Sequence, residues 1–564
     1  MFEDRLGSRG LSRFYALFQI FVVCALLGFG NFVAYKIASS IATKPESQWS
    51  ETDRAAVHDF HELKALEREA VSGDLTAELK SRLATLHDRY ARGDLHSYIT
   101  VLPSLPFYVT FAVVVGAYMI LGGMAAAALN EALQGILIVM FSVMLIPTGL
   151  SSIGGWSQLR ERVPKEMFNL FGGDGGSPLF IFAVLFASLV QIHGLSHNMG
   201  IYGSAKNEFA ARFGGVTGAY MKRVMIVLWA FAGLIAVAVF GIGGLADPDA
   251  VWGVMTTRLL GPGFIGLMLA GVLAGTMSTL AAKALAIASL FVRNFWHHLR
   301  PATTQQQSVR AARWTIFCVL VLGVIAAEAM SDVESLVKLV LTVNIPFGAA
   351  VILMFFWRRL TVPAVWASVA LSAFSILVAP LTASRIDAIA QRPTLTQIVE
   401  SNGRPVSVYF KNVVRLNPDD PASPLIGRGR FNFEAYVLSW LGLHPARLSV
   451  SGRETAQFLF DGFFPFVVLM LVSFVTRPPE KDRLDLFYGK MKTPIGPTPE
   501  LEIAGMEETR RHPNRFDQTK LFGQNSSWEF AKWDRVDTLG FFGCCATSGV
   551  IILVFILLLR AAGT

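Results

Sequence analysis

The sequence predicts an all-α protein that crosses a membrane many times. Of its 564 residues, 53% are hydrophobic and 16% are charged, and the mean hydropathy is +0.48, which is more apolar than soluble globular proteins are. Apolar runs of about 20 residues, the length that a helix needs to cross a bilayer core about 30 Å thick, recur along the chain. Basic residues gather in alternate connections between these runs. Together these observations indicate a helical bundle that folds in a lipid bilayer and not in water.

Length and hydropathy predict about eleven membrane-spanning helices. Their expected positions are 14–39, 104–126, 131–155, 178–203, 217–245, 263–292, 309–331, 333–357, 361–382, 457–476 and 539–560. We therefore divide the chain into a leader with the first span (1–41), an extracytoplasmic helical insertion (42–103), a transmembrane core (104–382), an extracytoplasmic loop (383–456), a further span (457–476), a cytoplasmic loop (477–538) and a C-terminal span (539–564).

Lys and Arg in the short connections predict the orientation, because cytoplasmic loops carry an excess of both. If the spans alternate, one side holds most of the basic residues, namely Arg5, Arg9, Arg13 and those within 206–223, 293–313 and 358–359. Arg160, Arg162 and Lys165 fall on the other side. The N-terminus is therefore expected in the cytoplasm and the C-terminus outside it. Membrane topology also explains the net charge of +8, so no nucleic-acid partner is expected.

Three polar stretches interrupt the apolar runs. Apolar residues at helical spacing among charges of both signs predict a helical hairpin over 51–93, outside the membrane. Richness in Pro, Asn and Arg predicts an irregular external loop over 383–454, and the polar segment 478–537 falls on the cytoplasmic side. The four cysteines lie inside predicted spans, and their spacing suggests neither a zinc site nor a disulfide framework.

The run from Gly271 to Pro301 carries polar side chains in the middle of an apolar span. Residues three and four apart share a helix face, so Gly275, Ser278 and Thr279 form one patch. Two hydroxyls and a main-chain carbonyl are oxygen ligands that suit Na⁺. Small residues of this kind equally let two membrane helices pack closely. The spacing alone leaves both interpretations open.

Three stretches together resemble the sodium:solute symporter family. AGVLAGTMSTLAAKALAIASLFVRNFW, residues 270–296, is similar to its eighth core helix, in which a small residue precedes a Ser-Ser or Ser-Thr pair. LGGMAAAALNEALQGILIV, residues 121–139, resembles its junction between two spans, with Glu131 where Asp is commoner. NMGIYGSAKNEFAARFG, residues 198–214, resembles the cytoplasmic exit from its sixth core helix. The resemblance extends from about Arg13 onward and implies a LeuT-like inverted-repeat transporter fold.

The resemblance implies a secondary active transporter that couples the uptake of a small polar organic solute to Na⁺ by alternating access. It implies a sodium site on the carbonyl of Gly275 and the hydroxyls of Ser278 and Thr279. The family's distribution points to the bacterial inner membrane as the cell membrane concerned, with the lipid bilayer as a constant partner. Since no nucleophile with a base and no convincing metal set stands out, an enzyme is not expected.

Polar residues in two other spans are candidates to line the solute site. In the resembled fold the sixth core helix lines the cavity, and we expect the tenth to be interrupted near Thr342 and Pro346. The candidates are Gln191, His193, His197 and Asn344. Hydrogen bonds between helices explain the same residues equally well. His193 and His197 are four apart, a spacing compatible with a metal, but they lack the Glu of the zinc-protease motif.

Lys283 departs from the family pattern. It lies one turn beyond Thr279, where Ala281 and Ala282 replace the polar residues that family members commonly carry after the hydroxyl pair. A buried ammonium is costly, so a Lys within a membrane helix indicates a function. It could face a water-filled cavity or pair with a carboxylate, which is compatible with sodium coupling. Alternatively, its charge could replace that of Na⁺, which would make transport proton-linked or cation-independent.

The start of the chain is a second departure. The family's broken first core helix, which completes the sodium site, has no equivalent before the first span at 14–39, and about three spans of a complete member are not found. We therefore expect an N-terminally truncated chain, with a missing N-terminal segment or a partner chain to supply these helices. The alternative is a non-transporting membrane scaffold or sensor derived from a symporter.

Overall fold

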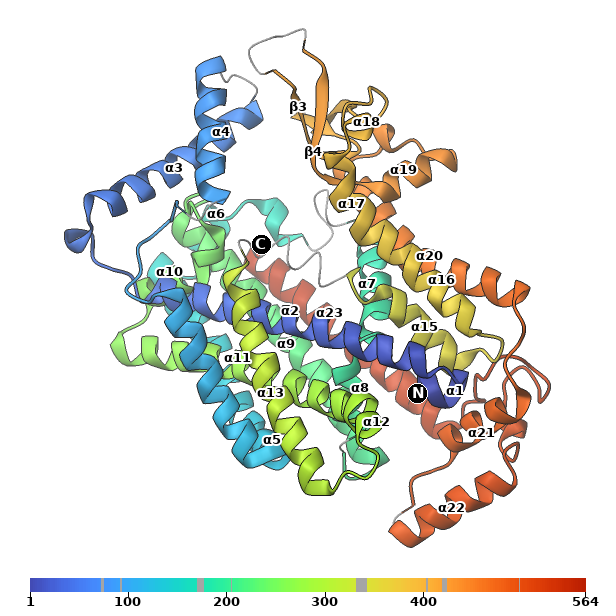
Figure 1. Cartoon of the computed structure of the whole chain (residues 1–564). Helices are drawn as coiled ribbons and strands as arrows, with labels where there is room; N and C mark the ends of the chain where they lie inside the picture. Colours follow the sequence, from blue (N-terminus) through green and yellow to red (C-terminus); the bar gives the residue numbers. More distant parts are fainter. Residues whose placement is uncertain are drawn as a thin grey trace.

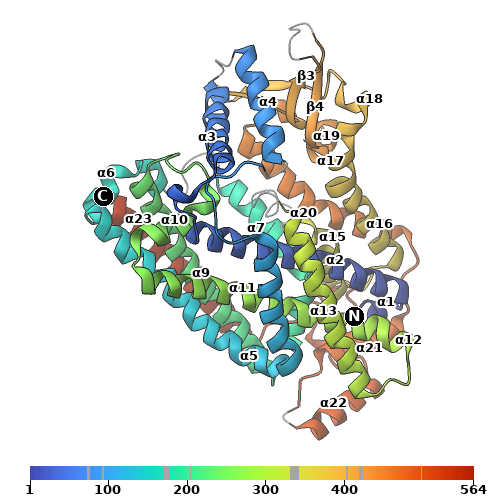
Figure 2. The same cartoon turned by 60° about the vertical axis from the view of Figure 1, so that its left-hand side comes forward.

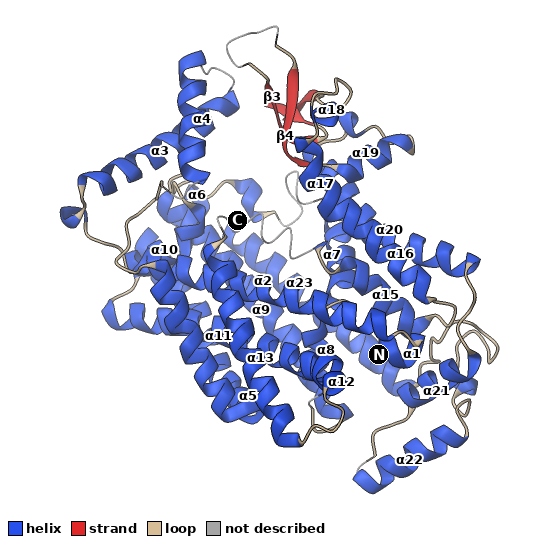
Figure 3. Ribbon diagram, viewed as in Figure 1, coloured by secondary structure: helices blue, strands red, loops and turns tan. Residues whose placement is uncertain are grey.

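The computed structural model describes the chain except residues 73–75, 92–93, 170–176, 204, 331–341, 402–403, 418–422, 497 and 564. The described chain is mostly helical, with two small antiparallel sheets of two strands each (Figure 3). Within it, nine stretches of helix are long and apolar enough to cross a membrane. Two shorter apolar helices accompany them, α7 (Pro178–His193) and α15 (Ile345–Phe356). The predicted all-α multi-pass fold class is confirmed.

The long helices form a bundle in which α2 crosses the centre of the view in Figure 1 and packs against α11 and α13. The long ones are α2 (Arg9–Ile41), α5 (Ser104–Ile153), α9 (Glu208–Phe240), α11 (Pro262–Phe291), α13 (Gln305–Glu328), α16 (Val362–Ala373), α20 (Val450–Val475) and α23 (Arg535–Gly563). A π-helical turn at Phe374–Val378 and α17 (Ala379–Thr382) prolong α16. Side chains just before several helices accept their first free N–H groups: Ser8 caps α2, and Asn207 caps α9.

The two spans predicted at 104–126 and 131–155 correspond to two candidate spans, Ser104–Gly122 and Leu129–Ile153, which lie within a single helix, α5. It is one continuous helix of 50 residues, about 75 Å if straight, which is far longer than one membrane crossing. The Tyr118 hydroxyl and the Gln134 amide, 16 positions apart, both contact Met277 of α11. The helix must therefore bend back on itself between these residues, as Figure 2 shows. Each half of α5 accounts for one predicted span.

The predicted span 178–203 is interrupted. Helix α7 ends at His193, Gly194 and Leu195 are not helical, and α8 (Ser196–Gly203) begins directly afterwards. A turn at Val343 and Asn344 precedes α15. The span expected at 333–357 is described only from Thr342 onward. Non-helical main chain at this depth is tolerated where the protein itself satisfies the exposed polar groups.

The insertion and the segment 383–456 lie at the same end of the molecule (Figure 1). The predicted helical hairpin is present as α3 (Glu51–Ser72) and α4 (Ala77–Ala91), which pack through Phe60, Leu63, Leu66 and Leu86. The expectation of an irregular loop at 383–454 is wrong. This segment contains α18 (Asp387–Ala390), β1 (Ile398–Ser401), β2 (Arg404–Ser407), β3 (Phe410–Arg415), β4 (Leu425–Phe431) and α19 (Phe433–Trp440). Its own apolar cluster, centred on Val408, Phe410 and Phe431, explains why it folds.

At the opposite end, the leader and the segment 477–538 fold together. They form α1 (Phe2–Leu6), α21 (Lys481–Lys492) and α22 (Pro499–Arg511). Helix α1 packs against α21, and both meet the turn between α15 and α16. The simple polar loop expected at 477–538 is therefore a packed unit that joins three regions far apart in the sequence.

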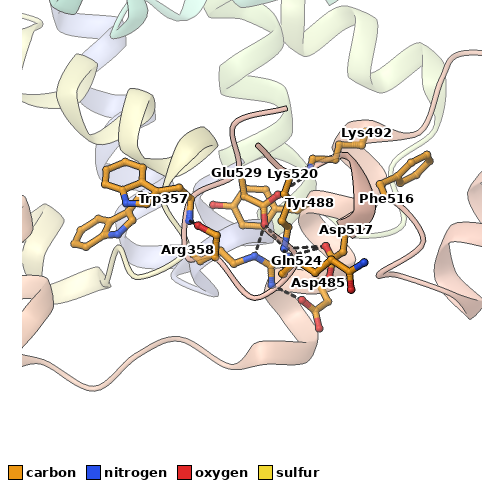
Figure 4. A network of polar contacts seen from close by, with 12 residues as sticks. Trp357, Arg358, Asp485, Tyr488, Lys492, Phe516, Asp517, Lys520, Gln524 and Glu529 are labelled. Atoms are coloured by element: carbon orange, nitrogen blue, oxygen red, sulfur yellow. Dashed lines mark hydrogen bonds and ion pairs between the residues drawn. The ribbon is translucent and has the colours of Figure 1, made fainter. Parts of the chain in front are cut away.

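A buried network of charges holds this unit together (Figure 4). The Arg358 guanidinium, between α15 and α16, forms ion pairs with Asp485 of α21 and with Glu529. The Glu529 carboxylate is fully buried and also pairs with Lys492 Nζ at 2.5 Å and Lys520 Nζ at 3.1 Å. We refer to Arg358, Asp485, Lys492, Lys520 and Glu529 as the Arg358 network.

The leader docks on this network through one side chain. Arg5 is fully buried. Its guanidinium donates hydrogen bonds to the carbonyls of Trp357 and Arg358, at 3.1 and 2.9 Å, and to the Tyr488 hydroxyl at 3.2 Å. Five donors on one planar group suit such a site better than a Lys ammonium would. The N-terminal helix is therefore fixed to the bundle and to α21 at once.

The Arg358 network predicts acid sensitivity. Burial alone would raise the pKa of Glu529, but hydrogen bonds from Lys492 and Arg358, together with their charges, outweigh it and hold the pKa below its ordinary 4.5. The stability that the ionised carboxylate contributes is thus present above pH 4.5 and is lost as the pH falls through the lowered pKa. Unfolding temperatures measured from neutral to acidic pH should fall less steeply for Glu529→Gln than for the wild type. Parallel curves would contradict this assignment.

The two ends of the chain lie at opposite ends of the bundle. Helix α23 follows the segment that carries Glu529 and ends against α6 (Trp156–Arg162), where the Arg160 guanidinium donates to the Ala562 carbonyl at 3.1 Å. Helix α6 follows the C-terminal end of α5, which lies away from the bend in that helix. The fold thus separates the leader and the C-terminus across the apolar region.

Candidate functional site

The break between α7 and α8 and the turn before α15 meet beside α2. The Gln19 amide of α2 donates to Asn344 Oδ1 at 2.8 Å, and its carbonyl oxygen accepts from the Ser196 N–H at 3.3 Å. The Tyr15 hydroxyl, one turn before Gln19, donates to the Gly194 carbonyl at 2.9 Å. We refer to Tyr15, Gln19, Gly194, Ser196 and Asn344 as the helix-break cluster. Its polar contacts satisfy main-chain groups that the interruptions release.

Close main-chain packing holds the end of α7 against the start of α15. A Cβ atom on Gly348 of α15 would lie 1.8 Å from the carbonyl oxygen of Val190 in α7. A Cβ atom on Gly194 would lie 2.6 Å from the carbonyl oxygen of Asn344. Only glycine fits at both positions without moving the main chain. Small residues let membrane helices approach closely. These contacts therefore fix the position of α7 relative to α15.

The cluster retains unused hydrogen-bonding capacity. Gln19 and Asn344 are both fully buried. Within the part of the chain that the structure describes, Asn344 Nδ2 and Ser196 Oγ are buried and have no hydrogen-bond partner. Burying such groups without a partner costs free energy. A donor and a hydroxyl between two helix ends form a setting in which a polar solute can bind.

Three of the four predicted solute-lining residues lie at or beside the cluster. Asn344 belongs to it, Gln191 is buried in the last turn of α7, and His197 is half-buried in the first turn of α8, with its Nδ1 atom unpartnered among the described residues. His193 does not join them. It is exposed, and its Nδ1 lies 2.7 Å from the carbonyl oxygen of Leu189 on its own helix. Residues two apart on a helix point to nearly opposite faces, which separates His193 from Gln191.

The predicted ion ligands lie together on α11. The Thr279 hydroxyl donates to the Gly275 carbonyl at 3.1 Å, so these two oxygens already share one position on the helix. Ser278 is half-buried and Thr279 is exposed. Gly275 faces Ile138 in the second half of α5, which a Cβ atom would approach to 3.5 Å. The patch predicted from the spacing is therefore present, beside the bent helix.

Lys283 lies between the ion patch and the helix-break cluster. It is one turn beyond Thr279 on α11, and its charge acts on His197 of α8. Helix α8 packs against α11, with Ala286 of α11 3.7 Å from where a Cβ atom on Gly200 would lie. Among the described residues, Lys283 forms no ion pair within 4 Å. The structure thus brings a predicted coupling residue next to a predicted solute-lining residue.

A cavity of about 550 Å³ lies elsewhere, beneath the insertion. Its walls come from the outer end of α2, the segment 95–104 and the end of α13, and include Tyr35, Lys36, Tyr98, Asp247 and Glu328. None of the predicted site residues lines it. Polar groups in its walls mostly satisfy one another, as in the ion pair between Lys36 and Asp247. The helix-break cluster, and not this cavity, is therefore the candidate functional site.

Comparison with known proteins bears on the segment that contains most of these residues. Residues 104–370 match the Sodium:solute symporter family. This symporter-family segment includes all three stretches on which the resemblance rested, so the resemblance is confirmed for that part of the chain. Tyr15 and Gln19 lie before it, and α20 and α23 lie after it.

Individual relatives agree. A sodium/proline symporter of Staphylococcus aureus is 23% identical over 273 residues, which are 44% of this chain and 50% of the relative. The sodium/proline symporter of Staphylococcus aureus strain Newman has the same identity and coverage. The chain thus spans about half the length of the curated relatives it matches. The solved structure of a Na⁺-coupled sialic acid symporter, substrate-bound and outward-open, covers 85% of this chain and 93% of its own at 12% identity, with a TM-score of 0.45.

The structure adds Tyr15 and Gln19 to the predicted site. Gln19 is an amide within the apolar run 14–39, and that isolation was a usable signal. Its partner Asn344 lies 325 positions away in the sequence, so their pairing was not predictable from local pattern. The described chain thus combines a segment that matches the symporter family with a break between α7 and α8 that the Gln19 amide joins to the turn before α15.

Proposed function

We propose that this chain is a secondary active transporter in the cell membrane that couples the inward movement of a small polar organic solute to Na⁺. The observation that carries the proposal is the helix-break cluster, where the break between α7 and α8 meets the start of α15 at Gln19 inside the bundle. Discontinuous helices near mid-membrane are where secondary transporters bind their solutes and ions. The match of residues 104–370 to the symporter family supports the same conclusion.

The proposed ion ligands are the Gly275 carbonyl and the hydroxyls of Ser278 and Thr279. All three are hard oxygen donors, and two of them already lie 3.1 Å apart. When Na⁺ binds, the Thr279 hydroxyl would turn its lone pairs toward the ion and give up its bond to Gly275. These residues supply one face of the site on α11. The name of the sialic acid symporter, which is Na⁺-coupled, supports this choice of ion.

The proposed solute carries a carboxylate. Helices α8 and α15 both begin at the cluster, and the N-terminal end of a helix carries partial positive charge. Asn344 Nδ2 is a buried donor with no partner within the described residues. Proline and sialic acid, the solutes in the names of the relatives, both carry this group. Gln191, His197 and Asn344 would then bind the solute's polar groups.

Lys283 favours a second candidate function, transport coupled to protons or to no cation. Its ammonium, which forms no ion pair with any described residue, lies one turn from Thr279 and acts on His197. An ionisable group inside a membrane bundle marks ion or proton pathways. The two candidates differ in their cation dependence. Lys283→Ala would alter that dependence if the ammonium replaces Na⁺, and would leave it unchanged if it does not.

The proposed orientation places the Arg358 network in the cytoplasm. Three segments predicted to be cytoplasmic from their basic residues, the leader, 358–359 and 477–538, meet in this one unit. The insertion and the strands β1–β4 would then lie outside the cell. A bacterial inner membrane fits the curated relatives, which come from a bacterium.

Purified full chain in proteoliposomes tests the proposal. With a sodium gradient directed inward, we expect uptake of at least one labelled carboxylate from a panel that includes proline and sialic acid. Ser278→Ala combined with Thr279→Ala should raise the Na⁺ concentration for half-maximal uptake at least about tenfold, the effect of ~1.4 kcal/mol of lost binding energy. Ser289→Ala, an exposed hydroxyl on the same helix that bonds to the Leu285 carbonyl, is the matched control and should change nothing. Uptake that ignores the sodium gradient would overturn the proposal.

A further inference from the structure

A buried carboxylate lies outside the symporter-family segment. Asp461 lies near the middle of the apolar helix α20 and is 1% exposed. Within the described chain, neither of its carboxylate oxygens has a hydrogen-bond partner. An unpaired charge in such a place costs several kcal/mol, so the carboxylate must carry either a proton or a bound cation.

A second buried carboxylate lies nearby. Helix α19 packs on α20, and its Glu434, which is 0% exposed, interacts electrostatically with Asp461. One Glu434 oxygen accepts from Arg430 Nη2 at 3.2 Å, and the other has no partner among the described residues. Among the described residues, the positive charge of Arg430 acts on Asp461, and the Gln457 side chain lies beside Asp461 one turn back. Two carboxylates and one guanidinium leave a net charge of −1.

A hydroxyl from a third element completes the setting. Helices α16 and α20 run antiparallel: the Thr361 N–H donates to Ser473 Oγ, and the Ser368 hydroxyl donates to the Pro465 carbonyl at 3.3 Å. One turn further along both helices, this register brings Ser372 to the level of Asp461. Ser372 is 0% exposed, and its Oγ has no partner in the described part of the chain. A hydroxyl without a partner among the described residues thus lies at about the level of Asp461 along α20.

We infer that Asp461, Glu434 and Ser372 form a second site for Na⁺, separate from the ion patch on α11. Carboxylate and hydroxyl oxygens are the ligands that hard cations prefer. A net charge of −1 matches one monovalent ion and leaves a divalent ion overcompensated. The site lies beyond residue 370, so it belongs to no part of the chain that the family match covers.

The site also has a route to the helix-break cluster. Gly462, next to Asp461, packs on α7, where a Cβ atom would lie 2.7 Å from the Phe186 ring. Helix α7 ends at His193, two turns beyond Phe186. A cation that orders the middle of α20 would therefore stabilise the helix on which the cluster depends.

Binding of radioactive sodium to the purified full chain tests the inference. In a background of Ser278→Ala and Thr279→Ala, which removes the α11 patch, Na⁺ should still bind, and should still raise the unfolding temperature relative to an equal concentration of N-methylglucamine. Adding Asp461→Asn should abolish both effects, whereas Asp482→Asn, an exposed carboxylate in α21, should leave both intact. Because the readout is binding, it separates failure of this site from failure of the proposed transport function.

Two results would overturn the inference. Sodium binding that is unchanged by Asp461→Asn would mean that the carboxylate carries only a proton. If the Asn variant does not fold, Ser372→Ala decides, because it keeps every charge. Weaker sodium binding by Ser372→Ala in the same background supports the site, and unchanged binding rules it out.

Discussion

Gly348→Ala is expected to destabilise the protein by about 1–3 kcal/mol, the cost of overpacking a close-packed interior. The added methyl would lie 1.8 Å from the Val190 carbonyl oxygen and 2.7 Å from its carbon. These are main-chain atoms, so α7 and α15 must move apart. Thermal unfolding in detergent measures the effect. Gly233→Ala in α9, where nothing lies within 4 Å of the new methyl, is the control and should change stability little.

Gly348→Ala should reduce solute uptake by more than the loss of folded protein alone explains. Separation of α7 from α15 moves Gly194 away from Asn344 and leaves Gln19 with at most one of its two partners. Protein that remains folded at the assay temperature is therefore expected to bind solute at least about tenfold more weakly, because sub-ångström placement of such groups decides affinity. A Gly348→Ala protein that matches Gly233→Ala in both stability and uptake would contradict the assigned role of this contact.

Arg358→Ala should destabilise the protein by about 3–5 kcal/mol, because it leaves buried carboxylates without their partner. The Asp485 and Glu529 side chains are 7% and 0% exposed, so water cannot replace the guanidinium. The matched control is Arg9→Ala. Arg9 also pairs with a carboxylate, Glu3, but the two side chains are 72% and 38% exposed, and such a surface pair contributes at most about 1 kcal/mol.

Limited proteolysis adds a second readout for the same variant. Without Arg358, α21 loses its link to the turn between α15 and α16, so we expect cleavage within 477–538 to become faster. Arg9→Ala should leave the cleavage rate unchanged. If both variants unfold at the same temperature and are cleaved at the same rate, the Arg358 network does not hold this unit in place.

The parts of the fold that were predictable from the sequence depend on local pattern. The apolar run of α11 and the spacing of Gly275, Ser278 and Thr279 are properties of one helix, and the structure reproduces both. The bend in α5 was expected as a gap between two helices. The Ala-rich stretch MAAAALNEAL favours helix so strongly that the main chain stays helical through the turn.

The parts that were missed depend on contacts between distant residues. The segment 477–538 resembles a solvated loop, because its many charges find their partners only in the folded state. Arg358 and Glu529 are 171 positions apart. The sheet segment at 383–456 has short strands, which carry little periodic signal, and a core made of residues from several of them. His193 shows the opposite case. Its residue type made it a candidate to line the solute site, but it lies on the exposed face of α7 and contacts its own helix.

Asp461 shows the same limit within the membrane. In the sequence it is a single acidic residue near the start of an apolar span, where it could have faced water. Only the packing of α16, α19 and α20 around it shows that it is buried and unpaired.

Sodium movement driven by solute tests the central claim most directly. The full chain is placed in proteoliposomes with equal Na⁺ on both sides, and a carboxylate solute from the uptake panel is added outside. Coupled transport predicts that radioactive sodium enters together with the solute, although no sodium gradient drives it. The combined variant Ser278→Ala and Thr279→Ala should reduce this sodium entry. Solute uptake into proteoliposomes that hold folded wild-type protein, measured without any sodium, would contradict the claim that this chain couples solute movement to sodium movement.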